Sequence, residues 1–286
     1  MMRTQGHLIG DRQTQTGTAT GAGTATGTGA GVGMRAEAGT CLDALAPLLD
    51  PTTFRHIETF GLGYGWRCWE VGAGGTSVIS WLAKKVGPTG RVLVTGLDTS
   101  WIASVARPPV EVHVHDVGAD DPPVEGFDLV HARLALVHVP DRQRAVRTMV
   151  SALRPGGRLL VEDADPALQP LACPDEYGPA QQLANRVRQA FRTLLAERGT
   201  DLACGRTLPR LLREAGLRGV RAEAYFPVAS PACAALESAT IRQVRDELVS
   251  ARLATGQDID RHLANVASGD MDPLPAPMIS AWGKKA

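Results

Sequence analysis

The sequence predicts an α/β fold in which helices cover both faces of a parallel β-sheet. Two observations lead to this prediction. From about residue 40 onward, strand-like segments alternate with helix-like segments, a pattern typical of parallel strands joined by crossover helices. The strand-like segments are also almost continuously apolar, as expected for strands that are buried on both faces.

The elements follow in order along the chain. Two short leading helices are expected at 41–50 and 51–60. Later helices are expected at 76–86, 142–153, 183–195, 207–216, 235–253 and 259–266, from their apolar periodicity. The expected strands are 66–72, 91–98, 110–116, 127–136, 158–165, 220–228 and 277–285.

The first 35 residues differ in composition from the rest of the chain. The stretch TQTGTATGAGTATGTGAGVG contains almost only Thr, Gly, Ala and Gln. Such a segment buries too little apolar surface to offset its ordering entropy, so we expect residues 1–35 to be disordered and 36–286 to form the folded domain. Met34 is an alternative start of translation.

Charge and cysteine usage exclude several classes of protein. Lys and Arg number 30, as do Asp and Glu, so the chain lacks the basic surplus typical of nucleic-acid binders. No stretch approaches the ~18 consecutive apolar residues of a membrane span, and the first residues lack the apolar core of a secretory signal. The five cysteines are scattered without a CxxC pair, which indicates neither a metal site nor a disulfide framework. We expect a cytoplasmic protein.

A glycine-rich turn, EVGAGGT, follows the first expected strand and precedes a helix. Gly72 and Gly74 leave room for a ligand to approach the backbone, and Gly75 eases the turn. The exposed amides at a helix start favour anionic or polar groups. A tight turn without a ligand is the alternative interpretation.

Carboxylates stand at or near the ends of three successive strands. Asp98 ends the second expected strand and can accept hydrogen bonds from both hydroxyls of a ribose. Asp116 ends the third and can accept from the exocyclic amine of an adenine. Glu70 precedes the glycines, where it can orient the turn or meet a ligand ammonium. Ligands bind at this carboxyl edge in open α/β sheets.

These residues resemble a class I S-adenosylmethionine-dependent methyltransferase. The resemblance rests on EVGAGG, Asp98, HDV at 115–117, FDLVHARLALVHVPD and LRPGGRLLVEDAD, and it covers roughly residues 55–227, with PMISAW matching the family's last strand. It implies a Rossmann-like, seven-stranded, mostly parallel sheet whose last strand is antiparallel. It also implies S-adenosyl-L-methionine as the cofactor. The turn departs from the common GxGxG because Thr76 stands where a third spaced glycine often lies.

The resemblance assigns cofactor contacts to particular positions. These are Glu70, Gly72, Ala73 and Gly74 for the methionine part, Asp98 for the ribose, Asp116 and Val117 for the adenine, and Ala132 and Arg133 beside the methyl donor.

Methyl transfer requires a nucleophile positioned along the S–CH3 axis, and a general base helps when the acceptor is an alcohol, phenol or amine. His138 directly follows the fourth strand and is the predicted base. Capping of the loop or packing under the cofactor is the alternative role. Glu162, Asp163 and Asp165 end the fifth strand, where they either bind a polar acceptor or a basic group, or are solvated.

The acceptor is expected to be a small molecule, such as a secondary metabolite or a quinone-like aromatic. Insertions at 166–200 and 228–272 are expected to form a helical lid over it, with Tyr177, Phe191 and Tyr225 as aromatic candidates for the lining. Nucleic acid and membrane are not expected as partners, and a homodimer is left open.

Two other functions stay open at this point. One is a binding module that keeps the cofactor fold without turnover. The other is a nicotinamide dinucleotide enzyme, whose GxGxxG turn requires glycine at a position that Ser77 occupies.

Overall fold

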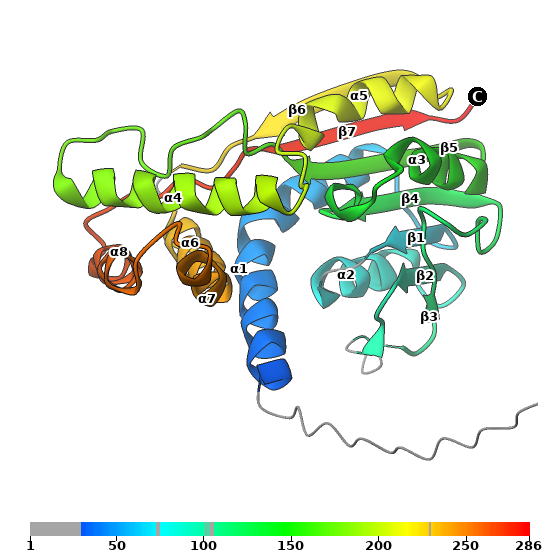
Figure 1. The fold of residues 1–286 in the computed structure, drawn as a ribbon. Helices are drawn as coiled ribbons and strands as arrows, with labels where there is room; N and C mark the ends of the chain where they lie inside the picture. Colours follow the sequence, from blue (N-terminus) through cyan, green and yellow to red (C-terminus); the bar gives the residue numbers. More distant parts are fainter. Residues whose placement is uncertain (1–29, 73–74, 101, 103–105, 229) are drawn as a thin grey trace, which may run out of the picture.

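The computed structural model describes residues 30–72, 75–100, 102, 106–228 and 230–286, with side chains from residue 45 onward. Its strands form one sheet in the order β3-β2-β1-β4-β5-β7-β6 (Figure 1). Neighbouring strands are parallel, except that β7 is antiparallel to both β5 and β6. The expected seven-stranded, mostly parallel sheet is therefore confirmed.

The elements alternate as the hydrophobic pattern predicts, except that the expected helix 235–253 is divided into two helices at Val244. The strands are β1 (Arg67–Val71), β2 (Arg91–Gly96), β3 (Val110–Val114), β4 (Phe127–Arg133), β5 (Leu153–Ala164), β6 (Arg218–Tyr225) and β7 (Met278–Lys284). The helices are α1 (Ala30–Thr59), α2 (Thr76–Val86), the 3-10 turn η2 (Leu136–His138), α3 (Arg142–Ala152), α4 (Pro179–Glu197), α5 (Cys204–Glu214), α6 (Pro231–Gln243), α7 (Arg245–Ser250) and α8 (Gly256–Ser268).

The two expected leading helices are a single helix, α1, so that prediction is wrong. Pro47 and Pro51 lie inside it, four residues apart, and both are exposed. On the opposite side of α1, residues such as Leu48 and Ile57 are buried against the rest of the protein. This packing keeps the helix continuous, although the prolines lack the backbone N–H groups that would donate helical hydrogen bonds. Residues 30–35, which we expected to be disordered, form its first turns, whereas 1–29 lie outside the described residues.

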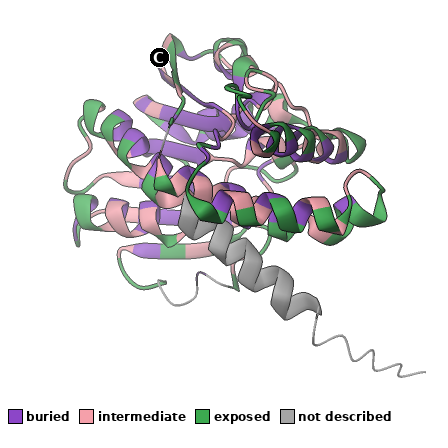
Figure 2. Ribbon diagram, turned by 90° about the vertical axis from the view of Figure 1, so that its left-hand side faces the viewer, coloured by how far each residue is buried: buried purple, intermediate pink, exposed green. Residues whose placement is uncertain are grey.

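Two apolar cores lie on opposite faces of the sheet. On one face, Met149 of α3 and Leu208 of α5 pack against the strands. On the other, Ile57 of α1 and Ile79 of α2 do so. Figure 2 shows that buried residues concentrate in the strands and on the inward sides of the helices. Both faces are covered, as predicted.

A further group of helices packs on itself rather than on the sheet. Leu183 and Val187 of α4 form a cluster with Ile241 of α6, Leu248 of α7 and Ile259 of α8. Figure 1 shows α6, α7 and α8 beyond one end of the sheet, with α1 between them and the strands. The helices of this group belong to the expected insertions 166–200 and 228–272. None of the described helices is both long and apolar enough to cross a membrane.

Candidate functional site

The glycine turn begins at Gly72, directly after β1. Gly72 has a φ of 65°, and its N–H donates to the carbonyl of Thr95 at 2.8 Å. A Cβ at this position would lie 2.8 Å from the Cβ of Ala135, which is closer than two non-bonded carbon atoms can approach. The turn therefore requires glycine and lies against the segment that follows β4. The predicted residues Ala73 and Gly74 lie outside the described residues.

Two of the predicted carboxylates lie at the same edge of the sheet, because β3, β2 and β1 are adjacent and parallel. Asp98 follows the end of β2 and is exposed, and its Oδ1 accepts from the amide of Ser100 at 2.9 Å. Beside it, Leu97 exposes 75% of its surface. Asp116 follows β3, and its Oδ1 accepts from the amide of Gly118 at 2.8 Å, so it also stabilises its own turn.

Glu70 does not point to the open edge; it is part of a buried ionic chain. Its Oε2 lies 2.6 Å from Nδ1 of His131 on β4, and Nε2 of His131 lies 3.3 Å from Oε2 of Glu162 on β5. The hydroxyls of Thr53 and Ser280 donate to Glu162 at 2.5 and 2.6 Å. This hydrogen-bonded network connects α1 to the strands β1, β4, β5 and β7.

Within this network of Glu70, His131 and Glu162, the attraction between opposite charges outweighs the cost of removing them from water. Burial alone would lower the pKa of His131, but Glu70 and Glu162 raise it to about 9. Burial alone would raise the pKa of Glu162, but His131, Ser280 and Thr53 hold it at about 2. The imidazolium of His131 therefore lies between carboxylates at neutral pH, where it holds neighbouring strands together.

The remaining residues that the resemblance assigned to the cofactor differ in exposure. Ala132 and Val117 are buried, with their side chains in the core. Arg133 is held against α1: its Nη1 donates to Oδ1 of Asp50 at 2.8 Å and to the hydroxyl of Thr53 at 3.1 Å. These side chains support the sheet edge from inside.

The acidic residues that end β5 are buried, so the alternative that they are solvated is wrong. Asp165 accepts two hydrogen bonds from the guanidinium of Arg206, at 2.8 and 2.6 Å. The carboxyl of Asp163 has no hydrogen-bond partner of good geometry in the described chain, and burial raises its pKa to about 7. Helix packing on the ends of β5 covers side chains that a local pattern places at an open edge.

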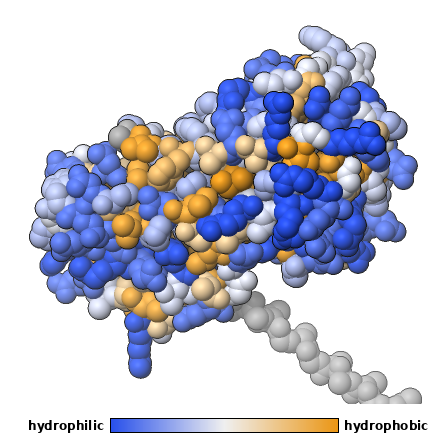
Figure 3. Space-filling view, turned by 90° about the horizontal axis from the view of Figure 1, so that it is seen from above, coloured by the Kyte–Doolittle hydropathy of each residue, from blue (hydrophilic) through white to orange (hydrophobic). Residues whose placement is uncertain are grey.

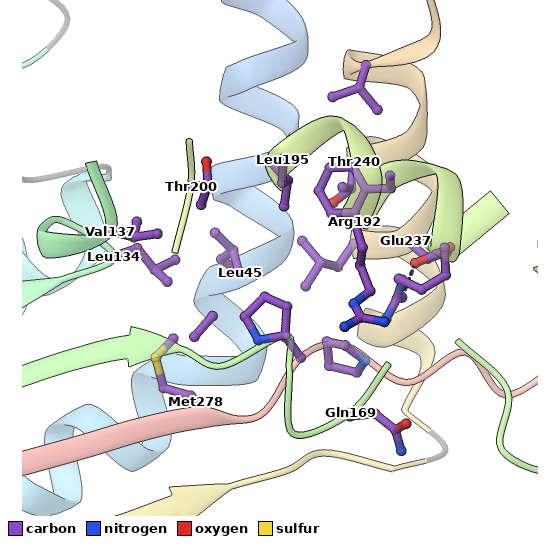
Figure 4. A pocket seen from close by; sticks show the side chains of 18 of the residues that line it. Leu45, Leu134, Val137, Gln169, Arg192, Leu195, Thr200, Glu237, Thr240 and Met278 are labelled. Atoms are coloured by element: carbon purple, nitrogen blue, oxygen red, sulfur yellow. Dashed lines mark hydrogen bonds and ion pairs between the residues drawn. The ribbon is translucent and has the colours of Figure 1, made fainter. Parts of the chain in front are cut away.

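A cavity of about 410 Å³ lies between the sheet edge and the outer helices. Its sheet-side wall is the segment after β4, with Leu134, Val137 and His138. Residues of α1, α4 and α6 form the other walls, and most of them are apolar. Figure 4 shows the side chains of Leu45, from α1, and Leu195, from α4, in this lining. The size is that of a small-molecule site.

His138 follows β4 and lines this cavity. Part of the side chain faces solvent, and burial of the rest lowers its pKa. The imidazole is therefore neutral near pH 7 and able to accept a proton. Of the aromatic candidates, only Phe191 contributes to the lining. Tyr177 is 72% exposed, with its hydroxyl donating to the carbonyl of Asp270.

Sequence reasoning missed the polar residues in the helical wall. Arg188 of α4 donates to Oε2 of Glu237 on α6 at 2.5 Å, and Nε2 of His262 lies 3.0 Å from Oε1 of Glu237. Burial alone would raise the pKa of Glu237, but Arg188 and His262 hold it at about 2. Arg188 and Arg192 are four residues apart beside the apolar stripe of α4, and this spacing was the one signal in the sequence.

Comparison with known proteins identifies the family. Residues 37–222 match the model of a family described as "Methyltransferase domain", which covers more than half of the chain. The chain belongs to this methyltransferase family. The predicted class, an S-adenosylmethionine-dependent methyltransferase domain of class I with S-adenosyl-L-methionine as its cofactor, is thereby confirmed.

Curated relatives match parts of this methyltransferase domain. Methyltransferase GfsG of Streptomyces halstedii is 29% identical over 192 residues, which are 62% of this chain and 61% of the relative. The ubiquinone/menaquinone biosynthesis C-methyltransferase UbiE of Vibrio parahaemolyticus is 30% identical over 126 residues, which are 41% of this chain and 48% of the relative. The match therefore spans between about half and three-fifths of the length of these relatives.

Solved structures share the fold. Phosphoethanolamine N-methyltransferase 2 of Haemonchus contortus, in complex with phosphomonomethylethanolamine and S-adenosylhomocysteine, has a TM-score of 0.51 at 15% identity, over 82% of this chain and 52% of its own. A putative sarcosine dimethylglycine methyltransferase of Galdieria sulphuraria has a TM-score of 0.50 at 13% identity, over 83% and 85%. At these identities the likeness concerns the fold.

The methyltransferase domain offers groups that fit S-adenosyl-L-methionine. The exposed carboxylate of Asp98 would accept from the ribose hydroxyls, and the apolar surface of Leu97 beside it would be covered by an adenine. Gly72 places no side chain on the turn, where a Cβ would collide with Ala135.

Proposed function

We propose that the chain transfers a methyl group from S-adenosyl-L-methionine to a small, mostly apolar acceptor that is bound in the cavity. The observation that carries this proposal is the position of the segment 134–138. Ala135 abuts the glycine turn, while Leu134, Val137 and His138 line the cavity. The expected methyl donor and the acceptor would therefore lie on either side of one short segment, which is the proximity that a displacement requires.

The chain's own residues have distinct roles in this proposal. The bound cofactor supplies a methyl group already activated on a sulfonium. Asp98 and the turn at Gly72 hold the cofactor, the outer helices act as a lid that excludes water from the cavity, and His138 accepts the proton of the acceptor. The lowered pKa of His138 favours this role.

The lining favours an acceptor with a large apolar part, such as a quinone-like aromatic or a secondary metabolite. One relative is named as a C-methyltransferase of ubiquinone and menaquinone biosynthesis, which supports this class. We assign small molecules rather than nucleic acids as acceptors, because acidic and basic residues are equal in number. We assign the activity to the cytoplasm, because Cys68, Cys173, Cys204 and Cys233 are free thiols, as is usual in a reducing compartment.

The test uses the purified full chain, methyl-labelled S-adenosylmethionine and fractions of a metabolite extract. Formation of S-adenosylhomocysteine together with a labelled product in one fraction supports the proposal. Binding of S-adenosylhomocysteine without turnover across all fractions indicates a binding module instead. Absence of heat with either form of the cofactor in calorimetry contradicts both functions.

A further inference from the structure

Arg192 of α4 carries a charge that no described residue neutralises. Figure 4 shows its side chain extending from α4 into the cavity. Its Nη1 donates to the amide oxygen of Gln189 at 3.2 Å, which is a neutral partner. Its Nε is buried without a hydrogen-bond partner. A buried donor of a charged group without a partner is costly, so this guanidinium is suited to a ligand.

The other charged side chains of the lining are already compensated. His138 is neutral near pH 7, because burial lowers its pKa. Each remaining charged group of the lining has an opposite charge next to it. The pairs are Arg188–Glu237 at 2.5 Å, Asp201–Arg142 at 2.8 Å, and Arg198–Glu247. The cavity therefore has a mostly apolar wall with one uncompensated positive charge, at Arg192.

We propose that Arg192 binds a carboxylate of the acceptor, so that the substrate class is an apolar small molecule that carries an acidic group. A guanidinium donates two parallel hydrogen bonds to a carboxylate, through Nε and one Nη. One carboxylate thus neutralises the charge and satisfies the buried Nε. A neutral hydroxyl would accept one hydrogen bond and leave the charge in place. This inference rests on the proposed function only in naming the bound molecule as the methyl acceptor.

The experiment compares two probes of equal chain length, octanoate and 1-octanol, by calorimetry on the full chain saturated with S-adenosylhomocysteine. The wild-type chain should bind octanoate about tenfold or more tightly than 1-octanol, as expected for a desolvated charged hydrogen bond. Arg192→Met, which keeps the apolar stem, should reduce this preference to about one. Arg192→Lys should keep part of it, because lysine retains the charge but not the planar fork.

Arg186 supplies the matched control. It lies on the same helix, but it is exposed and does not line the cavity. Arg186→Met should leave the preference for octanoate unchanged. Thermal unfolding of each variant checks that the fold is kept, and if Arg192→Met does not fold, the wild-type comparison and Arg192→Lys decide.

Three results overturn the proposal: equal affinity of the wild-type chain for both probes, no measurable binding of octanoate, or an unchanged preference in Arg192→Met. Both probes are also titrated without S-adenosylhomocysteine. A chain that prefers octanoate but binds no cofactor contradicts the proposed function and not the role of Arg192. A chain that binds cofactor without preferring octanoate contradicts the role of Arg192 alone.

Discussion

Nδ1 of His131 lies 2.6 Å from Oε2 of Glu70, two residues before the glycine that begins the turn. The contact links β1 to β4, and Glu162 extends the link to β5. Thr53 of α1 donates to Glu162 and accepts from Arg133. This network thus fixes the strand that carries the turn relative to the strand that leads into the cavity wall, and with them the two sites that we propose for cofactor and acceptor.

His131→Gln should reduce the free energy of unfolding by about 3–5 kcal/mol near pH 6, because it leaves buried carboxylates without their cation. The folded-state pKa of His131 is raised from 6.5 to about 9. Its contribution is therefore complete below 6.5 and is lost as the pH rises through about 9, so the deficit of the variant should shrink over this window. Urea unfolding at several pH values measures this.

The exposed His113 of β3 is the control for this substitution. His113→Gln should leave stability within about 0.5 kcal/mol of the wild-type value across the same pH range. A deficit for His131→Gln that stays constant from pH 6 to above 9 contradicts a protonated His131.

Asp163→Asn should gain stability relative to the wild-type chain as the pH rises, in the same direction as His131→Gln but over a lower pH range, because the folded-state pKa of Asp163 is also raised. Burial raises the pKa of the Asp163 carboxyl from 3.8 to about 7. Between these pH values the unfolded chain loses this proton while the folded chain keeps it, so the stability of the wild-type chain falls as the pH rises. The asparagine variant lacks this cost. Its stability relative to the wild-type chain should therefore rise from pH 4 to pH 7 and then level off, as measured by chemical denaturation. A flat difference over this range would show that Asp163 ionises as freely as in the unfolded chain.

Local patterns in the sequence predicted the sheet and the turn well. The strand before Gly72 and the position of Asp98 follow from apolar runs that end in glycine or aspartate, which are signals within a few residues. The antiparallel last strand came from the family resemblance. The strands and the turn at this edge were therefore predictable from the sequence, whereas the cofactor contacts assigned to the edge stay a prediction.

Contacts between distant parts of the chain were not visible. Thr53 donates a hydrogen bond to Glu162, which lies 109 residues later in the sequence, and the packing of α1 on the sheet brings the two together. The continuity of α1 through Pro51 likewise depends on its buried side. In the sequence, Arg192 is one of several polar residues beside the apolar stripe of α4. That its Nε is buried without a hydrogen-bond partner is apparent only when the surrounding helices are in place. Such features arise from tertiary packing, which local propensity does not encode.

Gly72→Ala should weaken the binding of S-adenosylhomocysteine about tenfold or more. The variant forces a Cβ to 2.8 Å from that of Ala135 and strains a backbone with a φ of 65°, so the turn must shift. Gly61→Ala is the control, because Gly61 also has a positive φ, of 84°, but has open space around the added Cβ. Calorimetry of both variants separates the clash at the turn from backbone strain alone. Equal losses in the two would contradict a specific role of the turn.

Asp98→Ala should also weaken binding of the cofactor, by about tenfold to a hundredfold, because the ribose hydroxyls would lose a charged acceptor. The fold should be kept, since Asp98 is exposed. Glu125 is an exposed carboxylate that precedes β4, at the opposite edge of the sheet, and Glu125→Ala should leave affinity unchanged. Unaltered affinity in Asp98→Ala would remove the ribose assignment.

His138→Ala should reduce kcat by about a hundredfold or more while changing cofactor affinity little, because the proposed base acts on the acceptor. In the wild-type chain, kcat should rise with pH as the imidazole loses its proton. The midpoint should lie below 6.5, since burial lowers the pKa of His138. The control is His113→Ala, an exposed histidine outside the cavity lining. Rates measured with the acceptor fraction found in the extract test both statements, and a variant at position 138 with full turnover and the same pH profile would exclude the base role.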